Sequence, residues 1–508
     1  MALNDITFVK GQGGLGRPLP GKDHISGMIF YTGTLPSGFT SSDRIKQVFS
    51  VQDAENLGIV GDYSDETKAT GTYLVTNAGA TGDTINITVT EYPTSTNSTG
   101  VVDLGTYTRL STDTTASILA ASLTAFINAG TLTHGYTASV NTATVTITAR
   151  KGLGIFLNTG SPITVTPTGT IAGTLTQFSG GVASLKKPWH YHISEYFRIQ
   201  PQGNLYIGMY AVPGTYDFTD LVTVQQYANG EIRQFAVYCD GTTYSSGKVQ
   251  AAQAVAATLE SQKMPASIIT TFNYSAATLA TLADLSGLAS NKVSVVIGQD
   301  GFNLGYKIYK ASGKSITNLG CVLGAVSLAK VSDDIAWIGK FDLSDGSENN
   351  VAAFANGVLF SAQSTSLLST LNDYRYIFLT KQTGYTGTWV NDSHTCILQS
   401  SDYAYIENNR TIDKAIRLLR IGYLPALNSP ITLNSDGTLS DTSVAYFEGL
   451  GDQSMAQMVR DAEISAFDVT VDPTQNVQST NKLVVAVKIV GVGVARNIVV
   501  NIKYVLSL

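Results

Sequence analysis

The sequence ends on Lys482-Leu-Val-Val-Ala-Val-Lys-Ile-Val490 and, after a Gly-Val-Gly turn, on Asn497-Ile-Val-Val-Asn-Ile-Lys-Tyr-Val-Leu506. Because β-branched residues dominate both segments, each is predicted to be a strand. The side chains that share one face of the second strand are Ile498, Val500, Ile502, Tyr504 and Leu506. An apolar strand needs a pairing partner, since an unpaired edge promotes aggregation. Either this chain or a neighbouring copy must therefore cover it.

The composition is typical of a compact, β-rich protein built from several domains. The chain has 508 residues, of which only 14% are charged, and its formal net charge is −6. This length exceeds what one hydrophobic core supports, so about three or four domains are expected. The basic residues are dispersed and form no stripe that could follow a phosphate backbone. Nucleic acid is therefore not an expected partner.

The sequence also bounds the environment of the protein. No apolar run approaches the ~18–20 residues needed to cross a bilayer, and the N-terminus lacks the basic and apolar regions of an export signal. We therefore expect no direct membrane insertion. The three cysteines, Cys239, Cys321 and Cys396, are far apart, and they are predicted to be buried free thiols in a reducing compartment.

Changes in composition divide the chain into five parts. Residues 1–22 are rich in Gly and Pro and are predicted to be an extended arm. Residues 69–185 are rich in Thr and read as a small α+β domain inserted at the surface of another domain. The flanking segments 23–68 and 186–440 alternate strands with helices, which predicts an α/β core with a mixed sheet and helices on its faces. Residues 441–508 form a C-terminal domain that ends in a β-hairpin arm.

Two amphipathic helices are expected before the terminal strands. The first covers Thr411–Tyr423, where Asp413 and Arg417 have the i,i+4 spacing of an ion pair. The second covers Asp452–Ala466 and carries Met455, Met458 and Val459 among its apolar residues.

Two motifs could bind a phosphate group or a metal ion, but their context is against both. The segment Gly11–Gly16 resembles a phosphate-binding glycine loop, yet no apolar strand precedes it and no helix follows. His190 and His192 have the spacing of neighbours on one strand face, but no third ligand lies nearby in the sequence. A flexible arm and a half-buried polar strand are the favoured interpretations, so no metal and no cofactor is expected.

One segment offers a basis for catalysis. His394 and Cys396 could supply a base and a thiol nucleophile, although such pairs are normally brought together by the fold rather than by adjacency. The sequence has no GxSxG or HExxH motif, and Asp333-Asp334 is predicted to be a solvated turn. No catalytic residue is therefore assigned, and the protein is not expected to be an enzyme.

The two ends of the chain suggest a mechanical role instead. An extended segment binds by adding a strand to the edge of a sheet, where main-chain hydrogen bonds supply affinity. If the arm of one copy pairs with the terminal hairpin of another, the contact is heterologous. Heterologous contacts that do not close produce helical filaments or stacked rings.

At both ends, and ahead of the first predicted amphipathic helix, the sequence resembles the sheath proteins of contractile phage tails and phage-like injection systems. The resemblance covers residues 1–64 and 186–508. The segments that carry it are Ile25–Gly33, Lys46–Ser50, Ala54–Gly58, Gly387–Asp392, Tyr405–Arg417, Phe467–Val477, Asn481–Val490 and Ala495–Ile502.

The resemblance implies a function and a set of partners. It implies six-membered rings of this chain, stacked around an inner tail tube and bounded by baseplate and terminator proteins. It further implies a contraction that drives the tube through a target membrane. The particle would be a phage tail (virion) or a phage-like particle assembled in the bacterial cytoplasm.

The same interpretation assigns roles to two sets of residues. Met455, Met458 and Val459 are predicted to lie on a helix that faces the tube. The residues predicted to pair strands between subunits are Ile6, Phe8, Leu483, Val485, Val487, Ile489, Ile498, Val500, Ile502 and Tyr504.

Three other functions remain open on the sequence alone. A non-contractile virion protein could carry the same arms. A glycan-binding surface adhesin would account for the Thr-rich segment and the many Tyr residues. An enzyme would depend on the segment that contains His394 and Cys396.

Overall fold

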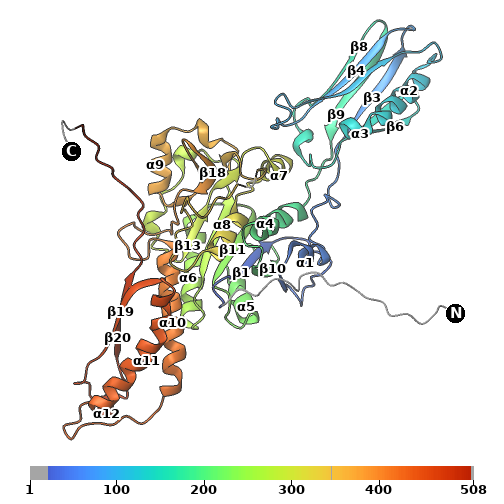
Figure 1. Ribbon diagram of the computed structural model, residues 1–508. Helices are drawn as coiled ribbons and strands as arrows, with labels where there is room; N and C mark the ends of the chain where they lie inside the picture. The colour runs from blue at the N-terminus through green and yellow to red at the C-terminus, as the bar shows by residue number, and fades with distance from the viewer. Residues whose placement is uncertain (1–20, 345, 505–508) are drawn as a thin grey trace, which may run out of the picture.

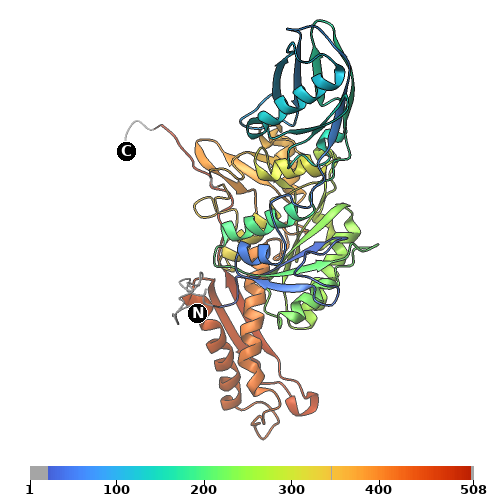
Figure 2. The ribbon, with the colours of Figure 1, turned by 90° about the vertical axis from the view of Figure 1, so that its right-hand side faces the viewer.

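A computed structural model describes residues 21–344 and 346–504. The chain is elongated, with three parts in a row (Figures 1 and 2): the inserted domain at one end, the α/β core in the middle and a C-terminal unit at the other end. The mixed α/β and α+β fold expected from the sequence is confirmed. Residues 1–20 of the predicted N-terminal arm, with Ile6, Phe8 and the Gly11–Gly16 segment, lie outside the described residues.

The core is built on a seven-stranded sheet in the order β16-β13-β12-β11-β1-β10-β2. Its strands are β1 Ile25–Tyr31, β2 Ile45–Val48, β10 Asn204–Tyr210, β11 Gln234–Thr243, β12 Ser267–Asn273, β13 Val293–Val296 and β16 Tyr376–Ile377. All neighbouring pairs are parallel except β10 and β2, which are antiparallel. Every residue of β1 is buried, as expected for a central strand of a parallel sheet that is covered on both faces.

Helices cover both faces of this sheet. Ile29 points to the face covered by α5 and α6, while Met28 and Phe30 point to the face covered by α4 and α8, because alternate side chains of a strand point to opposite sides. The core helices are α1 Val51–Asn56, α4 Lys186–Ile199, α5 Asp220–Tyr227, α6 Ser246–Ser261, α7 Leu304–Ser312, α8 Leu319–Leu328 and α9 Thr365–Asp373. Short strands β14 Gly298–Asp300, β15 Ala352–Phe354, β17 Leu379–Gln382 and β18 Tyr385–Val390 form two small antiparallel pairs beside the sheet.

The inserted domain has a hydrophobic core that combines two antiparallel sheets with one main helix. Its elements are β3 Thr70–Ala78, β4 Thr84–Thr90, β5 Val101–Thr108, α2 Ala116–Ala129, α3 Thr131–His134, β6 Thr137–Asn141, β7 Thr144–Thr148, β8 Ile163–Pro167 and β9 Ile171–Ser179. Thr115 caps α2 by accepting a hydrogen bond from the backbone of Ile118. Asp113 instead accepts hydrogen bonds from Tyr107 and Ser122.

The C-terminal unit packs two long helices and a two-stranded sheet together. Its elements are α10 Ile406–Tyr423, α11 Asp441–Arg460, β19 Ile464–Val471, α12 Val477–Thr480 and β20 Val485–Gly491. The second helix differs from the predicted Asp452–Ala466. It begins earlier because Ser440 caps it, and it ends before Ala462, whose φ of +57° is incompatible with a helix.

The predicted ion pair between Asp413 and Arg417 is wrong. Asp413 pairs with the buried Lys292 of the core, and Arg417 pairs with Asp23 at 3.1 Å. Both side chains are therefore used to attach α10 to the rest of the protein rather than to stabilise the helix alone.

The side chains of Met455 and Met458, which are predicted to lie on a helix that faces the tube, point into the subunit itself. Both side chains are fully buried among α10, α11 and β19, in a cluster that includes Ala415 and Ile464. Only Val459, with 37% exposure, is available on the surface. The apolar positions of α11 are thus explained by packing within the subunit.

Replacement of Met458 by Ala should lower the free energy of unfolding of the C-terminal unit by about 2–4 kcal/mol, because it leaves a cavity in a closed core. Val459→Ala, one residue further along the same helix, is the matched control and should cost well under about 1 kcal/mol. Urea denaturation of both variants checks this. Equal costs would contradict the burial of Met458.

Candidate assembly interface

The C-terminal sheet contains only two strands. β20 pairs with β19 in antiparallel register, from Val471 opposite Val485 to Ile464 opposite Gly491. Among the residues that the structure describes, neither strand has a second neighbour, so each leaves one edge of backbone N–H and C=O groups unpaired. Such edges bind further strands readily.

Among the residues described up to Tyr504, the last two segments do not form the predicted hairpin. The first segment, as β20, pairs with β19 instead. The second segment has no strand assignment up to Tyr504, where the described chain ends. The sequence could not show which segment pairs with β20, because β19 has the same alternating pattern as the final segment.

Of the predicted pairing residues, four lie on or next to β20 and are half-buried. Leu483 and Val485 pack on the cluster that contains Phe447, and Ile489 packs on the cluster that contains Met455. Together with Val487, these side chains hold the sheet against its own subunit. Their backbone edge, rather than their side chains, is what remains available to another copy.

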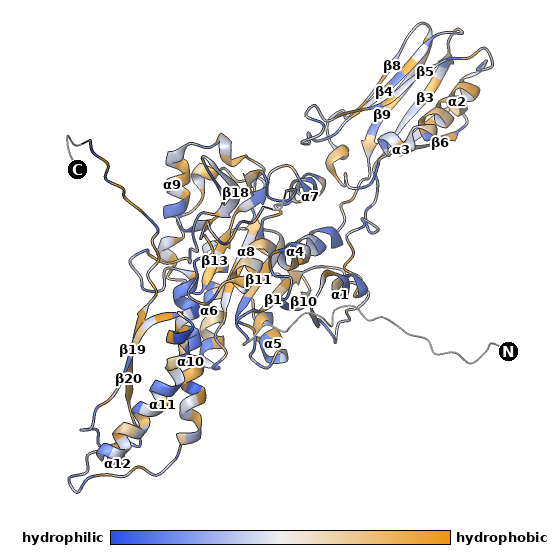
Figure 3. Cartoon of the chain, viewed as in Figure 1, coloured by the Kyte–Doolittle hydropathy of each residue, from blue (hydrophilic) through white to orange (hydrophobic). Residues whose placement is uncertain are grey.

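The other four described pairing residues are exposed on a tail that leaves the body (Figures 1 and 3). The exposed fractions of Ile498, Val500, Ile502 and Tyr504 lie between 71% and 107%. Their side chains alternate with Val499, Asn501 and Lys503 along the sequence. An exposed apolar segment of this kind marks an interaction site.

The root of the tail runs along a groove of about 730 Å³ in the surface of the core. The side chains of Trp337, Ile338, Trp389 and Val390 line the groove, together with the tail residues 492–496. The tail thus forms one wall of this groove at the point where it departs from β20, and the core forms the other wall.

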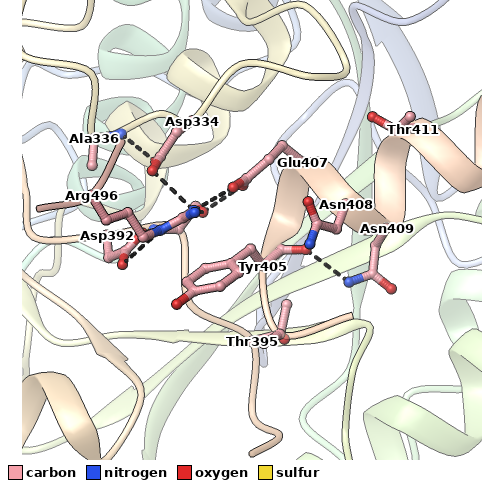
Figure 4. A network of polar contacts seen from close by, with 12 residues as sticks. Asp334, Ala336, Asp392, Thr395, Tyr405, Glu407, Asn408, Asn409, Thr411 and Arg496 are labelled. Atoms are coloured by element: carbon pink, nitrogen blue, oxygen red, sulfur yellow. Dashed lines mark hydrogen bonds and ion pairs between the residues drawn. The ribbon is translucent and has the colours of Figure 1, made fainter. Parts of the chain in front are cut away.

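Arg496 fixes the tail in this groove (Figure 4). Its Nε donates hydrogen bonds to both carboxylate oxygens of Asp392, at 3.0 and 3.1 Å, and its guanidinium pairs with Asp334 at 3.1 Å and with Glu407. It also lies over the ring of Tyr405, 3.5 Å from the centroid. Charge-assisted hydrogen bonds and cation–π contact of this kind are strong where they are shielded from water.

Two of these carboxyls, those of Asp334 and Glu407, have raised pKa values, chiefly because they are buried. Burial, with the charges of Glu407 and Asp392, raises the pKa of Asp334 to about 7. Burial likewise raises the pKa of Glu407, although Arg496 opposes this shift. The group that balances this acidic cluster is contributed by the tail itself.

No pattern in the sequence points to this cluster. Asp334 was expected to be a solvated turn, but it is buried. Asp392, Tyr405 and Glu407 belong to motifs that resemble sheath proteins, yet nothing in their spacing relates them to Arg496. The fold brings them together from separate loops and from the first turn of α10.

The other candidate sites are not assembled. His190 and His192 lie on α4 rather than on a strand. His190 contacts Glu55 at 2.8 Å, and His192 is buried against Tyr238, with ring centroids 4.9 Å apart. Trp189, His192 and Tyr196 follow one another at helical spacing, so the prediction of a strand for this segment is wrong. Within residues 21–344 and 346–504, no group of His, Cys, Asp and Glu side chains could hold a metal ion.

His394 and Cys396 do not form an activated pair. His394 contacts the side chain of Asn372 at 2.9 Å, and burial lowers the pKa of His394 to about 3. Burial raises the pKa of the Cys396 thiol, so it stays protonated near neutral pH and is a poor nucleophile. The three cysteines are buried free thiols, as predicted.

No helix in the described part of the chain has both the length and the apolar character required of a bilayer span. The fold and the interface thus define a multidomain α/β protein whose C-terminal sheet has unpaired edges and whose tail is exposed.

The chain belongs to the DUF2586 family. The model of the DUF2586 N-terminal domain matches residues 3–394, and that of the C-terminal domain matches residues 402–508. The second match includes α10 with the rest of the C-terminal unit. A comparison with curated proteins gives no match.

A comparison with solved structures finds several similar chains. The helical sheath of the anti-feeding prophage in its contracted state is 15% identical, with coverage of 64% of this chain and 84% of that chain and a TM-score of 0.45. The sheath tail protein from Desulfitobacterium hafniense is 10% identical, with coverage of 96% and 100% and a TM-score of 0.36. The sheath tail protein from Listeria innocua is 10% identical, with coverage of 94% and 96% and a TM-score of 0.38. These proteins are of the class that the sequence motifs resemble.

All three cysteines should resist a thiol reagent such as DTNB in the folded protein, because their sulfur atoms are buried and protonated. Addition of guanidinium chloride should release three reactive thiols per chain. Spectrophotometric titration of thiols checks this. Rapid labelling of Cys396 in the folded chain would contradict its burial and reopen the possibility of thiol chemistry.

Proposed function

We propose that this protein is the structural subunit of a contractile sheath, and that strands exchanged between copies hold the sheath together. The observation that carries the proposal is the combination of a two-stranded sheet with unpaired edges and an exposed apolar tail in the same C-terminal unit. In the part of the chain that the structure describes, the sheet has free edges that can accept a further strand, and the tail is an apolar segment that has no sheet to pair with in its own chain.

The geometry favours exchange between copies over closure within one copy. The tail is held in the groove by Arg496 and then leads away from β20 (Figure 1). A strand from a second copy can add to the free edge of β19 or β20 through main-chain hydrogen bonds, and alternate side chains then set the register. Because the donor and the acceptor are different surfaces, each copy can bind two neighbours, which produces an open or stacked assembly.

The proposal extends to partners and to mechanism through the sequence resemblance. The N-terminal arm, with Ile6 and Phe8, would donate a second exchanged strand. An inner tail tube would occupy the centre of the stacked rings, and baseplate and terminator proteins would bound the stack. Contraction would drive the tube through a target membrane, from a phage tail or phage-like particle assembled in the bacterial cytoplasm. No catalytic step is required of the chain.

Replacement of Val500 by Pro tests the exchange. Proline removes a main-chain donor and cannot join the interior of a sheet, so assembly should decrease at least tenfold, while the melting temperature of the monomer should change by less than about 2 °C because the residue is exposed. Val500→Ala, which keeps the N–H group, is the matched control and should assemble far better. Sedimentation and differential scanning calorimetry measure the two quantities. A variant with a large loss of melting temperature would show that the tail pairs within its own chain.

A further inference from the structure

One face of α10 carries charges that contact the roots of both arms. Glu407, Arg410, Lys414 and Arg417 follow one another at intervals of three, four and three residues, so they form one stripe along the helix. All four side chains are mostly buried. Each of these charges needs a partner, because a buried charge without one lowers the stability of the folded protein.

The basic part of the stripe holds the start of the described chain. Asp23, which directly follows the predicted N-terminal arm, pairs with Lys414 at 2.7 Å and with Arg417 at 3.1 Å. The guanidinium of Arg410 donates to the backbone oxygen of Asp23 at 3.3 Å. Burial raises the pKa of the Asp23 carboxyl, but Lys414 and the two arginines lower it by more, so Asp23 is ionised near neutral pH.

The acidic end of the stripe holds the root of the C-terminal tail. Glu407, in the first turn of α10, accepts a hydrogen bond from Arg496, and Asp334 and Asp392 of the core complete the pocket. The helix rises about 10 Å between Glu407 and Lys414. Asp23 and Arg496 are therefore held at neighbouring sites on one rigid element.

We propose that α10 is a common anchor for both arms, which fixes the points where they leave the subunit. Each anchored residue carries the charge opposite to that of its partners on α10. Asp23 pairs with Lys414 and Arg417. Arg496 pairs with Glu407. Movement between copies then leaves Asp23 and Arg496 in place on α10. A pull on one arm passes through α10 to the other.

The ion pairs of the two anchors also connect the two domains of the chain. Asp23 and Asp392 lie in the part of the chain matched by the family's N-terminal domain, whereas α10 and Arg496 lie in the part matched by its C-terminal domain. The same ion pairs therefore hold the two domains together at α10. What the arms connect to rests on the proposed function, but the anchoring itself can be tested in the free subunit.

Trypsin cleavage after Arg496 measures the C-terminal anchor in the full chain. Lys503, seven residues further along the exposed tail, is the internal reference. In the native protein, cleavage should occur after Lys503 and only slowly after Arg496. Asp392→Asn and, separately, Glu407→Gln should accelerate cleavage after Arg496 at least tenfold relative to Lys503. Asp468→Asn, an exposed acid on β19, is the matched control and should leave the ratio unchanged. An unchanged ratio in folded Asp392→Asn would overturn the C-terminal anchor.

Hydrogen exchange measures the N-terminal anchor. The amide of Ile25 donates to the backbone oxygen of Lys22 at 3.2 Å, directly beside Asp23. Asp23→Asn should accelerate exchange at Ile25 at least tenfold, and Asp468→Asn should not. Equal exchange in the native protein and in Asp23→Asn would overturn the N-terminal anchor.

Electron microscopy of assembled protein separates the anchor from the proposed function. Asp23→Asn and Asp392→Asn keep their exchanging segments, so they should still polymerise but with an irregular axial repeat. Deletion of residues 1–20 removes a connection and should abolish polymers. Regular polymers from both anchor variants would overturn the proposal. If the native chain itself does not polymerise, the sheath function fails, while the trypsin and exchange measurements still decide whether α10 is an anchor.

Discussion

Unpaired backbone groups at the edges of the β19–β20 sheet are the constraint on which the rest of the account depends. A two-stranded sheet is marginal in water unless it packs on other elements or gains further strands. Here α11 covers one face through Met455 and Phe447, which makes the sheet a stable platform without closing its edges. The exposed apolar tail that begins after Arg496 is a segment that can supply such a further strand.

The core keeps this platform in place, and the inserted domain takes no part in it. The seven-stranded sheet and its helices supply the loops that carry Asp334 and Asp392, and thereby the acidic pocket for Arg496. The inserted domain has its own hydrophobic cluster at the opposite end of the molecule (Figure 2).

Much of the fold could be predicted from the sequence because it follows local patterns. The segments that flank the Thr-rich segment alternate strands with helices and form the α/β core, and the Thr-rich segment folds as a separate α+β unit. Errors arose where two patterns compete. The alternating aromatic residues around His192 fit a strand but form α4, and the apolar stripe of α11 fits either a partner surface or an internal core.

The candidate site was only half predictable for a different reason. The exposed tail is visible in the sequence as a run of alternating β-branched residues, but the anchors depend on contacts between distant segments. Arg496 meets Glu407 and Asp392 across 89 and 104 residues, respectively, and Asp23 meets Lys414 across most of the chain. No local pattern encodes such pairs.

The most direct measurement is electron microscopy of the purified full-length chain as its concentration is raised. We expect stacked rings or helical tubes that appear in a concentration-dependent manner, because each copy completes the sheet of another. Monomers alone at high concentration, with the tail protected from hydrogen exchange within the single chain, would contradict the account.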